Sequence, residues 1–222
     1  MSPLLIGIVI VLIAGIIYLS GDMEKKDQRK KHLDSLVELL EAQIEEIPGR
    51  KNSYALRFDY KGLPFLYEDI EDNVFDKIMH RAFLRLQLSV HFNIVFTEES
   101  KTSFRSTPLG MSRAGASGET NQIEVPRFKE FKIFSNKPEV ARELFADDAV
   151  LRIFFKYKNK DVRGKPEMAL EIVDGVLTVK FFPLGQQLEP TVFDLRNNTS
   201  LIQNYLEDMV VVYQSVQNIV ET

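Results

Sequence analysis

Three histidines are the side chains of this chain whose unperturbed pKa lies nearest neutral pH. They are His32, His80 and His91. No two of them have the four-residue spacing that places a pair of metal ligands on one face of a helix. We therefore expect surface or boundary positions for all three, and we predict no metal site and no cofactor.

A serine nucleophile and an acidic site are the next chemical candidates. The segment Gly110–Ala114 has a glycine and a serine at the spacing of a nucleophile elbow, but its fifth residue is not glycine. That fold also needs a histidine after the serine in chain order, and His91 is the last histidine. The acidic residues between Glu68 and Asp72 lack the glycine and terminal glutamate of a calcium loop, so we expect a solvated turn. The sequence predicts no catalytic residue.

Composition narrows the remaining classes of function. The net charge of −4 at pH 7 disfavours nucleic-acid binding, because such proteins need a basic surface to displace counterions from phosphate. The absence of cysteine excludes disulfides, thiolate nucleophiles and cysteine-ligated zinc. A hydrophobic fraction of 45% with 27% charged residues is typical of a globular domain, so most of the chain is expected to fold outside a membrane.

The first 21 residues contain no charged side chain. At about 1.5 Å per residue, a helix over this segment would span roughly 30 Å, the thickness of bilayer hydrocarbon. A cleavable signal peptide would need a basic N-terminal region and a small-residue cleavage site, which the segment lacks. We predict a retained transmembrane anchor over residues 1–21, with lipid-facing positions such as Leu4, Ile8, Leu12, Ile16 and Leu19.

A basic cluster follows the anchor, made of Lys25, Lys26, Arg29, Lys30 and Lys31. The positive-inside rule therefore predicts that the N-terminus lies outside and that the C-terminal domain is cytoplasmic. The same side chains are candidates for contact with anionic lipid headgroups, although interleaved acidic residues weaken that reading.

Residues 22–48 are expected to form a juxtamembrane amphipathic helix that continues to about Glu46 and ends at Pro48. Its apolar stripe over residues 33–47 has helical spacing. Packing on the following domain is the simpler use of that stripe. A short parallel coiled coil, which would make the protein a homodimer, is the alternative.

Residues 49–222 are expected to form one α+β domain. Alternating apolar residues predict strands over 54–60 and 63–67, joined by a turn at Lys61 and Gly62. Apolar side chains at even positions from Ala82 to Phe96 predict one long bent strand, or two strands joined by a bulge. Residues 100–122 have no apolar periodicity and are expected to form a loop.

The last hundred residues carry clear start and turn signals. Pro138 and Asp147 are expected at the beginnings of two helices. Asp174 and Gly175 predict a two-residue hairpin turn, and a C-terminal helix is expected from Leu201. The assembly that we predict is an antiparallel sheet of about five or six strands with helices packed on one face.

Three segments carry a resemblance to a known group. They are Val125–Phe128, Phe131–Ser135 and Pro138–Leu144, in which a phenylalanine-rich strand leads into a helix. Together with the hairpin that follows, residues 123–182 resemble uncharacterised bacterial single-pass membrane-anchored proteins. The resemblance implies a bacterial inner-membrane setting and supplies no catalytic residues.

The favoured hypothesis is a membrane-anchored cytoplasmic interaction or scaffold module without catalytic activity. Its protein partner would meet a surface that includes Phe104, Arg105, Arg113, Phe182 and Leu184. The alternative is a domain that binds a lipid or a small apolar ligand between the sheet and its helices. An enzyme is the least favoured class.

Overall fold

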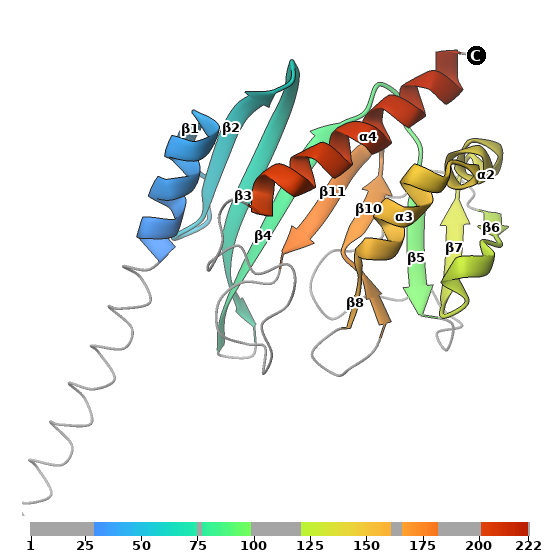
Figure 1. Cartoon of the computed structure of the whole chain (residues 1–222). Coiled ribbons are helices and arrows are strands. Elements are labelled where there is room, and N and C mark those ends of the chain that lie inside the picture. Colours follow the sequence, from blue (N-terminus) through green and yellow to red (C-terminus); the bar gives the residue numbers. More distant parts are fainter. Residues whose placement is uncertain (1–28, 75–76, 99–120, 161–165, 182–200, 222) are drawn as a thin grey trace, which may run out of the picture. The chain divides into compact units, whose positions relative to one another are not determined.

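The computed structural model describes residues 29–74, 77–98, 121–160, 166–181 and 201–221 (Figure 1). The chain divides into two compact units, residues 1–42 and residues 43–222. The predicted anchor positions and Lys25 and Lys26 lie outside the described residues, whereas Arg29, Lys30 and Lys31 lie in a helix. Within the described part of the chain, no helix is both long enough and apolar enough to cross a bilayer.

The described part of the first unit is a helix over residues 29–40. The next residue, Glu41, has φ 49°, and the N–H of Ala42 donates to the C=O of Val37 over 3.0 Å. This six-to-one hydrogen bond with a left-handed residue is a Schellman motif, which ends a helix. The helix predicted to run to about Glu46 is therefore too long by about six residues.

A nine-stranded antiparallel sheet dominates the second unit, in the order β1-β2-β3-β4-β11-β10-β5-β7-β6. The number of strands corrects the five or six that we predicted, because the predicted juxtamembrane helix contributes β1 and the end of the predicted loop contributes β6. The strands of this sheet are β1 Gln43–Glu46, β2 Tyr54–Tyr60, β3 Leu63–Val74, β4 Lys77–Gln87, β5 Ile94–Glu98, β6 Asn121–Ile123, β7 Phe131–Ser135, β10 Leu170–Val173 and β11 Val176–Phe181. A separate two-stranded sheet pairs β8 Lys158–Lys160 with β9 Pro166–Met168.

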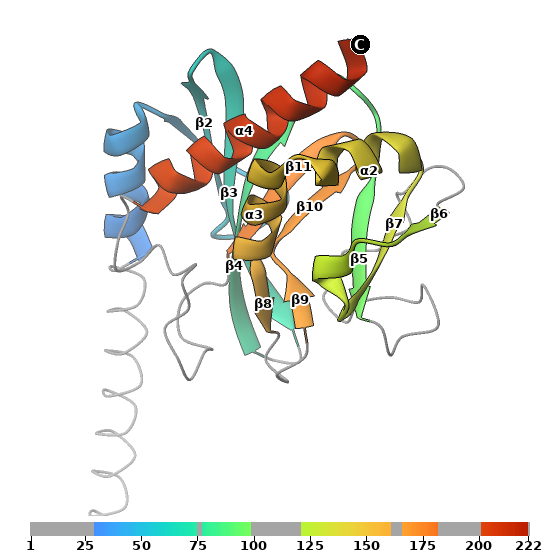
Figure 2. The same cartoon turned by 45° about the vertical axis from the view of Figure 1, so that its right-hand side comes forward.

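Three α-helices lie on the same face of the large sheet, as both views show (Figures 1 and 2). They are α2 Pro138–Ala146, α3 Asp148–Lys156 and α4 Leu201–Glu221. The 3-10 helix η2, Pro126–Phe128, precedes β7. Pro138 occupies the start of α2 and Asp147 caps α3 by accepting from the N–H of Ala149, so both predicted helix starts are confirmed. The α+β class and the helices on one face are confirmed as well.

The acidic segment is part of a strand and not the turn that we expected. β3 continues through it, with Glu68 opposite Phe83 and Asp72 opposite Met79 on β4. Alternation along the strand places Asp69 beside Ala82 on the helix-covered face, where Asp69 is 4% exposed. Pairing with β4 along the whole segment, and with β2 as far as Asp69, outweighed the low strand propensity of these carboxylates, which is a common result of tertiary context.

The even-numbered apolar run from Ala82 to Phe96 forms two strands, but no bulge joins them. β4 and β5 are separated in the sheet by the hairpin of β10 and β11. Residues 88–93 pass the tip of that hairpin, where the N–H of Leu88 donates to the C=O of Gly175 over 2.7 Å. Both predicted alternatives for this run are therefore wrong, because the pattern records which side chains are buried and not which strands are neighbours.

The hairpin has the register that its turn residues predicted. Ile172 lies opposite Leu177 and Leu170 opposite Val179. Asp174 and Gly175 have φ 51° and 77°, as a type I′ turn requires. Asn121 and Gln122, placed in the loop by the sequence, begin β6, and residues 99–120 lie outside the described part of the chain.

Candidate functional site

The long helix α4 gathers the principal polar network of the described residues. Its start at Leu201 was predicted, and seven of its apolar residues are buried. The helical spacing of the sequence predicts a core stripe made of Leu201, Tyr205, Met209, Val212, Tyr213, Val216 and Ile219. Four of these, Tyr205, Met209, Val212 and Val216, are each at most 1% exposed, whereas the other three are only partly buried. Ile202 and Leu206 are fully buried too, although the predicted stripe omitted them. The polar side chains of α4 therefore emerge beside a closely packed apolar surface.

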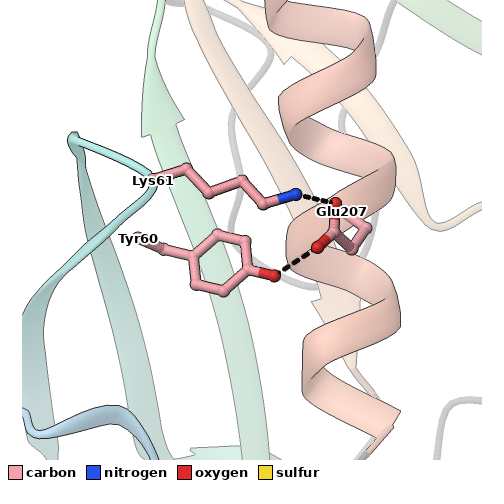
Figure 3. A network of polar contacts seen from close by, with 3 residues as sticks. All are labelled: Tyr60, Lys61 and Glu207. Carbon is pink, nitrogen blue, oxygen red and sulfur yellow. Dashed lines mark hydrogen bonds and ion pairs between the residues drawn. The ribbon is translucent and has the colours of Figure 1, made fainter.

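Glu207 lies between two side chains of the β2–β3 turn (Figure 3). Its Oε1 accepts from the Tyr60 hydroxyl at 2.5 Å, and its Oε2 is paired with the Lys61 ammonium. Lys61 and Gly62 are the turn residues, with φ 53° and 76°, so the turn itself presents the pair. The contact joins positions 147 residues apart in the chain.

Asp208, the next residue, makes a second contact of the same kind with the end of α3. Its Oδ2 accepts from Lys156 Nζ at 2.6 Å and from the Tyr157 hydroxyl at 3.0 Å. Tyr157 is fully buried and packs against Tyr205 of α4, with ring centroids 5.8 Å apart. We call Tyr60, Lys61, Lys156, Tyr157, Glu207 and Asp208 the α4 clamp.

Two further contacts hold the C-terminal half of α4. Ser215 donates to Oδ2 of Asp147 at 3.0 Å, while Oδ1 of the same carboxylate caps α3. Ser89 and Gln217 are joined by side-chain hydrogen bonds. The pKa of Asp147 is lowered, first by the hydrogen bond from the N–H of Ala149 and then by that from Ser215, against the effect of burial. The carboxylate thus orients two helices at once.

The electrostatics of the clamp oppose acid–base catalysis by its phenols. The hydrogen bond to Glu207 and then burial raise the pKa of Tyr60 to about 12. Burial and then the neighbouring Asp208 raise the pKa of Tyr157. A tyrosine that acts as a base near neutral pH needs a lowered pKa, so that its phenolate is accessible. Both phenols are instead fixed as hydrogen-bond donors, and the arrangement favours holding α4 in place.

An aromatic cluster fills the space between β5 and the helices. The ring of Phe96 lies 5.5 Å from Phe128, 6.2 Å from Phe145 and 5.8 Å from Phe154, measured between centroids. All four side chains are at most 6% exposed. Rings at these distances are in direct contact, so the interior beside β5 is occupied by the protein's own side chains.

In the described parts of the chain, the histidines and the carboxylates do not gather into a metal site. His32 lies in the helix over residues 29–40, and His80 lies on β4. His91 lies in residues 88–93, the crossover between β4 and β5, where its Nδ1 is 3.1 Å from the C=O of Asp174. Among the described residues, no group of three or more histidine and carboxylate side chains is placed to hold a metal ion.

The predicted partner surface lies outside the described residues, since Phe104, Arg105, Arg113, Phe182 and Leu184 all fall in the ranges 99–120 and 182–200. The clamp, in contrast, was missed by sequence reasoning. A signal was present in the adjacent pairs Tyr60-Lys61 and Lys156-Tyr157, but nothing local indicates that both point at the carboxylates of α4.

Comparisons with models of known protein families, with curated proteins and with solved structures gave no match to this chain.

Proposed function

We propose that this protein is a membrane-tethered interaction module, whose folded domain binds a protein partner at the cytoplasmic face of a bacterial inner membrane without catalysing a reaction. The observation that carries the proposal is the uncharged segment over residues 1–21, followed by the basic cluster that begins at Lys25. A dozen Leu, Ile and Val side chains in such a segment favour insertion by roughly 4 to 7 kcal/mol.

The chemistry of the folded domain supports a binding role over an enzymatic one. Its best-organised ionisable groups, those of the α4 clamp, are already paired with one another. With their raised pKa values, Tyr60 and Tyr157 are not suited to act as bases near neutral pH. Their contacts instead keep α4 on the sheet. The close packing around Phe96 gives no support to the alternative of an apolar ligand between sheet and helices.

Two exposed apolar side chains mark where a partner would gain most from contact. Ile44 on the edge strand β1 is 47% exposed, and Phe155 on α3 is 50% exposed. An edge strand also offers unpaired backbone groups. A parallel homodimer remains the alternative partner; it would use the helix over residues 29–40 alone, because Ile44 belongs to a strand.

The tether is tested by fractionating cells that produce the full chain or a variant without residues 2–21. We expect the full chain to stay with membranes after an alkaline wash and the variant to be released. A C-terminal reporter should be active only in the cytoplasm. Release of the full chain by the wash would disprove the tether.

The binding role is tested separately, with a photo-crosslinking residue placed in the full chain at Ile44, at Phe155 or, as a control on the polar face of α4, at Gln214. We expect one discrete adduct from Ile44 or Phe155 and none from Gln214. The absence of an adduct from both exposed sites, with the membrane location intact, would reject the interaction module and leave the tether standing.

A further inference from the structure

The large sheet has one short junction. β11 pairs with β4 from Val176 opposite Gln87 to Phe181 opposite Ala82. On the other side of the hairpin, β10 pairs with β5 at Ile172 opposite Ile94, and the described residues give no second pair there. The junction divides the sheet into a six-strand part, β1-β2-β3-β4-β11-β10, and a three-strand part, β5-β7-β6.

The chain before Leu170 explains why the junction is short. The C=O of Ala169 still accepts from the N–H of Lys180 on β11 over 2.7 Å, but its N–H donates to the C=O of Tyr157 over 3.0 Å. The residues before it form β9, which pairs with β8 in the small sheet, where Met168 lies opposite Lys158. β9 lies against β5 without joining its ladder, because β8 and β9 form a separate two-stranded sheet.

Asn93 holds the junction at the hairpin tip. Its Oδ1 accepts from the N–H of Asp174 at 2.5 Å, and its own N–H donates to Oδ1 of Asn136 at 2.8 Å. Next to it, the N–H of Gly175 donates to the C=O of Phe92 over 3.1 Å. Asn93 is fully buried. Its side chain links the segment before β5 to the hairpin, and the side chain of Asn136 links the backbone of Asn93 to the segment before α2.

Loss of a buried acceptor is costly, because the donor that remains keeps its desolvation penalty. Removing the Asn93 amide would leave the N–H of Asp174 without this acceptor at the point where the two parts of the sheet are joined. The longer ladders on either side would be untouched. Proteins open locally and sub-globally in contiguous cooperative units, and such a unit can exchange its amides before the whole domain unfolds.

We infer that β5, β7 and β6 open together at the β10 junction in a sub-global step, and that the hydrogen bond between Asn93 and Asp174 contributes to the free energy of this opening, together with the ring contacts of Phe96. This conformational property goes beyond the proposed function and does not depend on it. The six-strand part stays paired during the step, because the β2–β3–β4–β11 ladders do not cross the junction.

Hydrogen exchange followed by mass spectrometry tests the inference on the full chain in detergent. In the unsubstituted protein, with low denaturant, we expect amides of β5 and β7 to exchange through an opening of lower free energy than those of β2 and β3. A single shared free energy for all four strands would overturn the inference, and this measurement needs no variant.

Asn93→Ala and Ser53→Ala make a matched pair. Ser53 is 1% exposed, and its hydroxyl accepts from the N–H of Glu71 at 3.0 Å in the six-strand part. Each substitution thus removes one buried side-chain acceptor of a backbone N–H. We expect Asn93→Ala to speed exchange in β5 and β7 by about tenfold or more relative to β2 and β3, the factor that losing one such bond implies. Ser53→Ala should not reproduce this selectivity; equal acceleration of all strands by Asn93→Ala would contradict the inference.

Discussion

Glu207 and Asp208 are neighbours on α4, yet each accepts hydrogen bonds from one tyrosine and one lysine that belong to a different element. Glu207 is held by the β2–β3 turn and Asp208 by the end of α3. Successive helix residues point about 100° apart, so the two carboxylates face the two sides of the helix. One pair of adjacent residues thereby fixes α4 against the sheet and against a second helix.

The buried half of the clamp should contribute more to stability than the exposed half. Tyr157→Phe removes the hydroxyl that donates to Asp208 from a fully buried ring, and we expect a loss of about 0.5 to 1.5 kcal/mol in the free energy of unfolding. Tyr60→Phe removes the corresponding donor beside Glu207, whose side chain is 47% exposed, and should cost less. Urea unfolding of both variants measures the order; a larger loss for Tyr60→Phe would refute it.

The raised pKa of Tyr60 predicts a stability loss in alkali. The folded chain keeps the phenol proton up to about pH 12, whereas a tyrosine in the unfolded chain loses it near pH 10.0. Between these values the folded state binds more protons, so this contribution is present below pH 10 and declines as the pH rises through the window. Ultraviolet titration of tyrosinate should show a component near pH 12 that is absent in Tyr60→Phe, whereas the raised pKa of the buried Tyr157 is the same in both proteins.

The contact between Tyr60 and Glu207 also makes the stability of the fold depend on pH in acid, where stability falls as the pH is lowered. Hydrogen bonds from Lys61 and then from Tyr60 lower the pKa of Glu207 below its ordinary 4.5. Its contribution is therefore present above that value and is lost as the pH falls through the lowered pKa. Glu207→Gln should remove this acid dependence and move the Tyr60 titration to lower pH. An unchanged Tyr60 titration in Glu207→Gln would show that another group raises the pKa of the phenol.

Two turn glycines with the same backbone conformation should respond differently to alanine. Gly62 and Gly175 have φ 76° and 77°. A Cβ at Gly62 meets nothing within 4 Å, so Gly62→Ala should cost only the left-handed strain of about 1 to 2 kcal/mol. A Cβ at Gly175 would lie 2.5 Å from the backbone oxygen of Val90, and the crossover would have to move. We expect Gly175→Ala to lower the melting temperature much further; equal shifts would exclude the close approach.

The helix over residues 29–40 should gain from a glycine at its end. Glu41 adopts φ 49° in the Schellman motif, a conformation that costs a side-chain-bearing residue roughly 1 kcal/mol. Glu41→Gly should therefore stabilise this helix end, while Glu38→Gly, within the helix, should destabilise it by about 1 kcal/mol. Circular dichroism of the two variants during thermal unfolding distinguishes them, and a loss of helix in Glu41→Gly would contradict the assignment of the motif.

Sequence patterns correctly predicted the elements that are specified by residues close together in the chain. The register of the β10–β11 hairpin follows from Asp174 and Gly175, because a two-residue turn with positive φ leaves one possible pairing. The helix starts at Pro138 and Asp147 follow in the same way. The acidic segment failed this kind of reasoning, because Glu68 and Asp72 lie in β3 owing to neighbours on β4 that are far along the chain.

The sequence by itself determined the uncharged segment at residues 1–21, the α+β class, the hairpin register and the helix starts, since each depends on side chains within one or two turns of the chain. Only the tertiary structure decided that a late hairpin separates β4 from β5, that Asn93 joins the two parts of the sheet, and that Tyr60 and Tyr157 meet Glu207 and Asp208. These contacts depend on which surfaces are buried together. The hydrophobic pattern of a segment shows that a side chain will be buried, but it does not show which distant residue will cover it.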